Sequence, residues 1–294
     1  MRNIIVILSC FIFWGCKSQS ISTLKKNTDN NTLLWRISGN GLSKPSYLFG
    51  TFHLLCRGDI HFSNSLRSAL NQSDRVYMEI KMDDPNMLSN SMKYLVMKNN
   101  QSLKDLVSDS EFNILNNYFS DSLKMPVTVL QNIKPYFLLA MLYPKMLSCS
   151  NISGIEEELL KLVKSDDKPL YGLETIEFQA AIFDSIPYKV QAKELMQTID
   201  SIKYSKSEFT EMSDDYKNQR LDKLNQLMLK TEGVTKQYDN ILLDDRNKKW
   251  VNNLKDIIKN KSVFIAVGAG HLSGPKGLIN LFRTAGYTVE PLLN

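Results

Sequence analysis

The sequence is poor in the residue types and motifs that mark the commonest active sites. Its 294 residues include only three histidines and four cysteines. It has no His-x-x-x-His pair, no Gly-x-Ser-x-Gly motif, no phosphate-binding loop and no dinucleotide-binding glycine motif, so nucleotide binding and serine hydrolase chemistry are not indicated. The net charge of +5 comes from 36 basic and 31 acidic residues without a dense basic block, which argues against nucleic acid as a partner.

The apolar segment at the N-terminus is too short to span a bilayer and is typical of a targeting signal. Arg2 precedes an apolar run at residues 4–14, and Gly15 and Cys16 follow. This resembles a bacterial lipoprotein signal (residues 1–16), in which Cys16 becomes the lipidated first residue; an ordinary secretory signal and an uncleaved anchor are the alternatives. Residues 17–31 are polar and are expected to form a flexible tether. The sequence thus predicts a protein of the cell envelope, lipid-anchored at its periplasmic or outer-membrane face.

Two cysteines remain outside this leader, Cys56 and Cys149. An oxidising compartment permits a disulfide between them. A bridge requires their Cα atoms to lie within about 7 Å, which the sequence does not fix. A disulfide and two separate thiols therefore both stay open.

Hydrophobic patterning predicts a mixed fold. Strand-like runs occur at residues 33–38, 46–49, 75–80, 170–173, 262–267 and 287–292, whereas helical periodicity dominates residues 85–260. A hydrophobic content of 43% is sufficient for a full core. We therefore predict one α/β (α+β) domain over residues 32–294, with a small central sheet, helical crossovers and a large helical insertion.

Polar residues follow four of the predicted strands. His53, Glu79, Glu174 and His271 each come at, or just after, the end of a strand. Because loops at the carboxyl ends of such strands converge on one crevice, we expect these side chains to share a site. Two imidazoles with one or two carboxylates suit a divalent metal ion. His61 has the same Gly-x-x-His spacing as His53 and His271, but no strand precedes it, so we interpret it as a surface residue.

Several segments together resemble the TraB/GumN family, whose relatives include the Tiki metalloproteases. They are residues 34–42, 45–53, the strand that ends at Glu79, and residues 171–175, 245–247 and 267–271. The resemblance runs from about Leu33 to the C-terminus. It implies a fold similar to that of the erythromycin-esterase and Tiki proteins.

The resemblance also implies roles for the predicted site residues. Metal ligation falls to His53, Glu79 and His271, with manganese, cobalt or zinc as the ion and a bound water as the nucleophile. Glu174 is a further ligand, a partner that orients a histidine, or a helix N-terminal residue.

Arg246 matches an arginine of the family, and such a residue can hold an oxyanion or a substrate carboxylate. The alternative is an ordinary helix-surface arginine that pairs with Asp244 or Asp245.

These observations give three functional hypotheses. The first is an extracytoplasmic metal-dependent hydrolase, in particular a peptidase acting on a peptide or protein substrate. The second is a metal-free hydrolase in which His53 and Glu79 act as general acid and base. The third is a binding or inhibitory lipoprotein that acts through its helical insertion. The sequence leaves the oligomeric state open.

Overall fold

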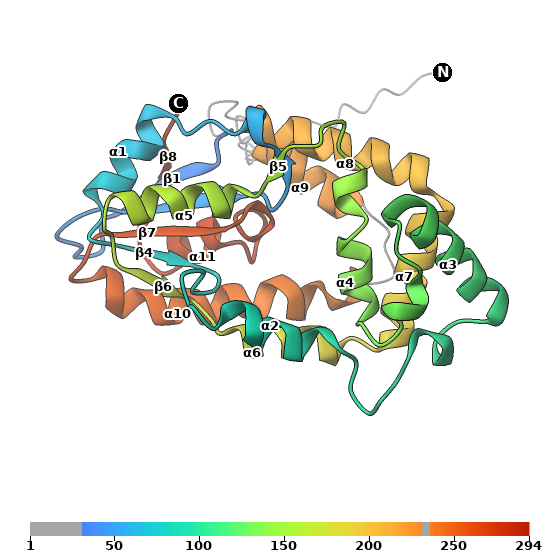
Figure 1. The fold of residues 1–294 in the computed structure, drawn as a ribbon. Helices are drawn as coiled ribbons and strands as arrows, with labels where there is room; N and C mark the ends of the chain where they lie inside the picture. The colour runs from blue at the N-terminus through green and yellow to red at the C-terminus, as the bar shows by residue number, and fades with distance from the viewer. Residues whose placement is uncertain (1–30, 231–235, 294) are drawn as a thin grey trace, which may run out of the picture. The chain divides into compact units, whose positions relative to one another are not determined.

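A six-stranded sheet forms the centre of the chain in the computed structural model, which describes residues 31–230 and 236–293 (Figure 1). Its strands are β1 (Leu34–Ser38), β2 (Ser46–Thr51), β4 (Arg75–Met78), β6 (Leu170–Gly172), β7 (Val263–Gly268) and β8 (Thr288–Pro291), in the order β6-β4-β7-β2-β1-β8. Strands β2, β7, β4 and β6 are parallel, and β1 and β8 extend the sheet antiparallel. The predicted strands and the mixed fold class are confirmed.

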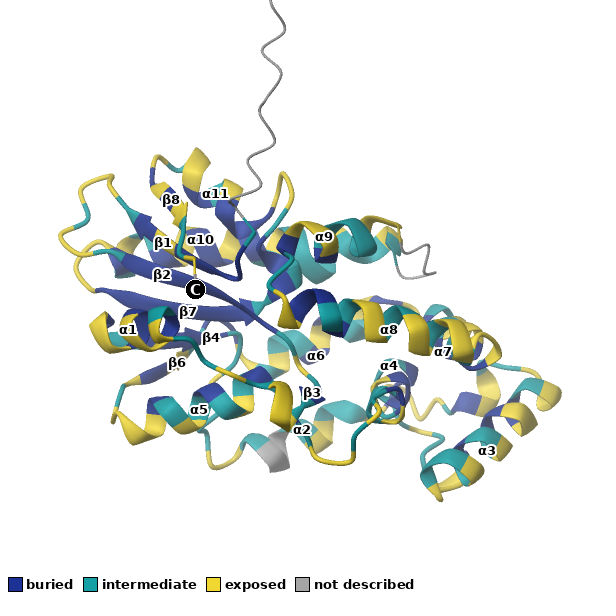
Figure 2. Ribbon diagram, turned by 90° about the horizontal axis from the view of Figure 1, so that it is seen from above, coloured by how far each residue is buried: buried dark blue, intermediate teal, exposed yellow. Residues whose placement is uncertain are grey.

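Helices cover both faces of this sheet. Figures 1 and 2 show α1 (Asn64–Gln72) and α5 (Ile155–Ser165) on one face and α10 (Asp245–Ile258) and α11 (Leu278–Thr284) on the other. Strand β7 is consequently buried along almost its whole length, as its uninterrupted apolar run requires. Helix α5 buries Ile155, Leu159 and Val163, which recur every four residues on the face toward the sheet.

The predicted helical insertion lies between β4 and β7 in the sequence. It comprises α2 (Met87–Leu95), α3 (Asp109–Leu123), α4 (Pro135–Ala140), α5, α6 (Ile176–Ser185), α7 (Tyr188–Asp200), α8 (Ile202–Lys217), α9 (Leu221–Lys230) and α10, interrupted by β5 and β6. Short 3-10 turns at Arg57–Asp59, Leu103–Asp105, Val127–Val129, Tyr143–Lys145, Lys236–Tyr238 and Ala269–His271, and a π-helical segment η7 (Asn240–Asp244), complete the elements. Helices α3, α4 and α7 share a second core around Phe119, Leu138 and Leu195. The insertion therefore has apolar packing of its own.

A two-stranded sheet that the sequence did not predict lies beside the main one. Strand β3 (Leu55–Cys56) pairs antiparallel with β5 (Ile152–Ser153). Cys56 is joined to Cys149 by a disulfide, with Cα atoms 5.9 Å apart. The bridge left open by the sequence is present, and it ties the chain after β2 to the chain before α5.

The predicted signal peptide at residues 1–16, with Cys16, and the predicted tether up to residue 30 lie outside the described residues. Residues 31–294 form one compact unit. Within the part of the chain that the structure describes, no helix combines the length and the hydropathy needed to span a bilayer.

Candidate functional site

The four polar residues that follow strands lie at one edge of the sheet. His53 follows β2, Glu79 follows β4, Glu174 follows β6 and His271 ends the 3-10 turn after β7. Because these four strands are parallel, their carboxyl ends point the same way. A glycine favours the close packing here, since a Cβ atom on Gly50 would lie 3.1 Å from the backbone Cα atom of Ala269.

His53 lies at the rim of this edge, with 78% of its side chain exposed. Its Nδ1 is 2.8 Å from Oε1 of Glu156 in the first turn of α5. This pairing is the main reason why the pKa of His53 is raised to about 9. Burial is the largest single influence on Glu156 and raises its pKa, but the hydrogen bond from His53, the charge of His53 and the Thr51 hydroxyl together lower the pKa. The pair is therefore an imidazolium and a carboxylate at neutral pH.

The backbone fixes the distance between His53 and Glu156. The Ile155 N–H donates to the Phe52 carbonyl at 3.0 Å, so the start of α5 lies directly against the chain after β2. A Cβ atom on Gly154 would lie 2.7 Å from the His53 carbonyl oxygen, so this contact requires glycine. The β3–β5 pairing and the Cys56–Cys149 disulfide close the same loop.

Arg246 lies at the centre of the site and is held by two carboxylates. Its Nη2 donates to Oε2 of Glu79 at 2.6 Å and to Oε1 of Glu174 at 2.5 Å. Its guanidinium also stacks 4.8 Å from the ring centre of Trp250, whose Nε1–H donates to Glu174. The alternative partners are occupied elsewhere, because Asp244 pairs with Lys276 and Asp245 with Lys248.

Glu79 is mostly buried and fully hydrogen-bonded. Its Oε1 accepts the Gly268 N–H at 2.9 Å, and its Oε2 accepts from Arg246 and from the Gln179 amide at 3.1 Å. Burial raises the pKa of Glu79, but positive charge on His271, the charge of Arg246 and the Gly268 N–H together outweigh burial and lower the pKa to about 2. Glu79 is therefore an ionised carboxylate at neutral pH.

His271 is buried and neutral. Burial is the main cause that lowers its pKa to about 4, and the charge of Arg246 acts in the same direction. Asn247 uses its amide group to donate to the carbonyls of His271 and Lys276, so its oxygen faces His271 Nδ1 at 2.7 Å. Nδ1 therefore carries the proton, and Nε2 presents a lone pair to Nη1 of Arg246 at 3.3 Å.

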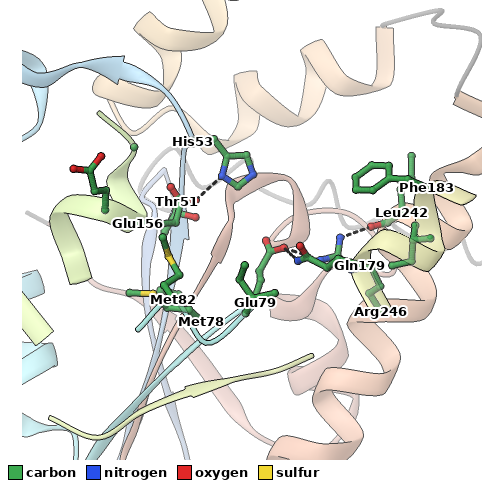
Figure 3. Close-up of a pocket in the computed structure, with 15 residues that line it drawn as sticks. Thr51, His53, Met78, Glu79, Met82, Glu156, Gln179, Phe183, Leu242 and Arg246 are labelled. Carbon is green, nitrogen blue, oxygen red and sulfur yellow. Dashed lines mark hydrogen bonds and ion pairs between the residues drawn. The ribbon is translucent and has the colours of Figure 1, made fainter. Parts of the chain in front are cut away.

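These groups surround a cleft of about 400 Å³ (Figure 3). His53 and Glu156 lie on one side, Glu79 and Arg246 lie at its centre, and Gln179, Phe183 and Leu242 lie on the other side. Its lining residues are Thr51, His53, Met78, Glu79, Ile80, Met82, Gly154, Glu156, Glu157, Gln179, Ile182, Phe183, Leu242, Arg246 and Ala266. His271 and Glu174 are behind this lining and reach the cleft through Arg246.

The carboxylate oxygens and imidazole nitrogens that could ligate a metal ion are not arranged to bind one. The oxygens of Glu79 and Glu174 are taken by N–H donors, and the free nitrogen of His271 faces the Arg246 guanidinium. Across the described ranges, no three His, Cys, Asp or Glu side chains are grouped so as to hold a metal. The positive charge between the carboxylates is supplied by Arg246.

Sequence reasoning did not find Glu156, Gln179, Asn247 or Trp250 as site residues. Glu156 is one of three consecutive glutamates in the first turn of α5, where acidic residues also favour the helix dipole. Trp250 follows Arg246 by four residues and therefore shares its helical face, and Asn247, which lies three residues before Trp250, reaches His271 from the adjoining face. His61 is exposed, in agreement with its interpretation as a surface residue.

Comparison with known proteins gives a family. Residues 33–291 match the model of the TraB/PrgY/gumN family, which is nearly the whole domain. No curated protein and no solved structure matches the chain.

Proposed function

Because the chain belongs to the TraB/PrgY/gumN family, we propose that it is an extracytoplasmic hydrolase with peptides or proteins as substrates. One observation carries this proposal: the charged His53–Glu156 pair lies in the same cleft as Glu79 and Arg246. Several segments resemble the TraB/GumN family, whose relatives include the Tiki metalloproteases, and this resemblance supports peptide hydrolysis in particular.

The charges of the cleft favour acid–base chemistry. His53 is protonated at neutral pH and can give a proton to a leaving amine, since proton donation is the task of a general acid. Glu79 is ionised, and its negative charge can orient an attacking water while its oxygens keep their N–H donors. All five N–H groups of Arg246 are engaged by Glu79, Glu174, Leu242 and His271, so the guanidinium would stabilise negative charge on a carbonyl oxygen through its positive charge and not by a direct hydrogen bond. In this scheme His271 and Glu174 hold Arg246 in place.

The metal-dependent version of this hydrolase, with His53, Glu79 and His271 as ligands, requires Arg246 to leave Glu79. A guanidinium 2.6 Å from Glu79 and 3.3 Å from His271 stands against it in the present arrangement. We therefore favour the metal-free version.

Cleavage of a peptide library, read out by mass spectrometry, tests the hydrolase proposal. We expect His53→Asn to lower kcat/KM by about 10²- to 10⁴-fold, the range typical of a lost general acid. His61→Asn is the matched control and should behave as the wild type, because His61 has the same Gly-x-x-His spacing outside the cleft. Absence of cleavage by the wild-type protein would overturn the proposal in favour of a binding or inhibitory protein.

Chelation of protein purified without a histidine tag, followed by metal analysis and an activity assay, separates the metal-free hydrolase from the metal-dependent one. The acid–base version predicts full activity after exhaustive chelation. Loss of activity on chelation, with recovery on adding Mn²⁺, Co²⁺ or Zn²⁺, would establish the metal-dependent version.

We also propose that lipid at Cys16 anchors the protein to the cell envelope. The Cys56–Cys149 disulfide supports an oxidising compartment. Cys16→Ser should move the protein from the membrane fraction to the soluble fraction of the envelope, and an unchanged distribution would argue against the anchor.

A further inference from the structure

One wall of the cleft is a single helical face. Gln179, Ile182 and Phe183 of α6 are spaced three and four residues apart and all line the cleft. Leu242, from the π-helical segment η7, lies beside Phe183 on this wall (Figure 3). Apart from the Gln179 amide, the wall is apolar.

This wall is fixed before any substrate arrives. The Phe183 ring packs 5.1 Å from the ring of Tyr136 and 5.4 Å from that of Phe137, so the helical insertion supports it from behind. The next residue, Asp184, pairs at 2.7 Å with Lys134, whose side chain is 1% exposed. Breaking such a buried pair is costly, which keeps α6 in one position. A preformed apolar surface binds a side chain without first paying an ordering cost.

The same helix also sets the position of the reacting groups. Gln179 donates to Oε2 of Glu79 at 3.1 Å, and Phe183 lies one turn further along α6. Because Gln179 holds the Glu79 carboxylate and lies on the same helix as Phe183, helix α6 fixes the distance from this carboxylate to the apolar wall. A group seated on the wall would place its neighbouring bond at the charged centre of the cleft.

We propose that the cleft takes substrates with a bulky apolar side chain next to the reacting bond, seated against Ile182, Phe183 and Leu242, and that Phe183 determines this specificity. The inference rests on the proposed function, because it assigns a substrate class to the same cleft. In apolar pockets, one methylene group more or less in the substrate changes kcat/KM by about 10- to 200-fold. Substrates with a phenylalanine or leucine side chain at this position should therefore be strongly preferred to substrates with glycine.

Binding of two small probes to the full chain tests the inference without requiring turnover. The probes are N-acetyl-phenylalaninamide and N-acetyl-glycinamide, followed by NMR shifts of the protein. We expect the phenylalanine probe to bind at least about tenfold more tightly, and Phe183→Ala to remove most of this difference. Equal binding of the two probes to the wild type, or an undiminished preference in Phe183→Ala, would overturn it.

Phe178→Ala is the matched control. Phe178 lies on α6 outside the cleft lining and packs 3.9 Å from the Lys249 ammonium, so this variant should keep the wild-type preference. Loss of the preference in Phe178→Ala as well would contradict the assignment to Phe183. If Phe183→Ala does not fold, Leu242→Ala removes part of the same wall, and an undiminished preference there overturns the inference.

Cleavage-site profiling separates this inference from the proposed function. Cleavage without preference for bulky apolar residues beside the cut bond would overturn the inference and leave the hydrolase proposal standing. Preferential binding of the phenylalanine probe without any peptide cleavage would overturn the hydrolase proposal and support an apolar binding cleft.

Discussion

His53 and His271 each follow a glycine by three residues beyond a parallel strand, yet their surroundings are opposite. His53 is exposed and paired with Glu156, which raises its pKa to about 9, whereas His271 is buried beside Arg246 and its pKa is lowered to about 4. At neutral pH one histidine is a cation at the rim and the other is a neutral acceptor in the interior. The motif positions the ring, and the neighbouring charges decide what the ring can do.

Removing Arg246 should have the largest effect on stability, because this residue supplies the positive charge in the buried surroundings of His271. Arg246→Met leaves Glu79 and Glu174 without a countercharge, and side chains of these two residues are only 16% and 0% exposed. We expect the free energy of unfolding to fall by about 3–5 kcal/mol in urea denaturation. The control is Arg36→Met, which breaks an exposed pair with Glu290 and should cost less than about 1 kcal/mol. Equal losses in the two variants would contradict the central role of Arg246.

Removing the disulfide should affect the surroundings of His53, at the rim of the cleft, more than those of His271. The double variant Cys56→Ser, Cys149→Ser should lose about 2–4 kcal/mol of stability, the usual contribution of a disulfide. Amide hydrogen exchange should then rise at Ile155 and Arg57, whose N–H groups bond the chain around His53 to residues near α5. Amides of α10, beside His271, serve as the internal control. Uniform exchange changes in both places would show that the bridge does not act on the rim in particular.

Neutralising Glu156 should have the smallest effect on stability and the sharpest effect on protonation. In Glu156→Gln, the pKa of His53 should fall from about 9 toward its ordinary 6.5, measured by NMR titration of the ring. Glu157→Gln is the control, since Glu157 pairs with Lys161 and is 53% exposed. An unchanged His53 pKa in Glu156→Gln would contradict the pairing.

This substitution also predicts a pH dependence with a definite sign. The folded-state pKa of His53 is above its ordinary value. The contribution of protonated His53 to the free energy of unfolding is therefore complete below about pH 6.5 and is lost as the pH rises through about 9. His271 acts oppositely, because its lowered pKa makes folding less favourable as the pH falls from about 6.5 toward 4. In Glu156→Gln the alkaline loss from His53 should disappear together with the acid loss from Glu156 itself, whereas the acid loss from His271 should remain.

The sequence predicted the strands and the edge where the site forms, because apolar runs that end at glycine or a polar residue depend on local patterning. It did not predict the partners within the site. Three successive glutamates look alike in sequence, and only the packing of Gly154 against the His53 carbonyl selects Glu156. Arg246 has acidic neighbours in sequence, yet the orientation of α10 turns it toward Glu79 and Glu174. Strands β3 and β5 have two residues each, too few for a period to be visible.

Strand β7 lies between β2 and β4 in the sheet, although it is the penultimate strand of the chain. His53 and Glu79 follow strands that do not pair with each other, and only the insertion of β7 brings their two loops to one edge. A growing chain that ends before residue 263 therefore has no assembled cleft. Such long-range pairing also slows folding. The order of the strands delays assembly of the cleft until residues 263–268 have been added.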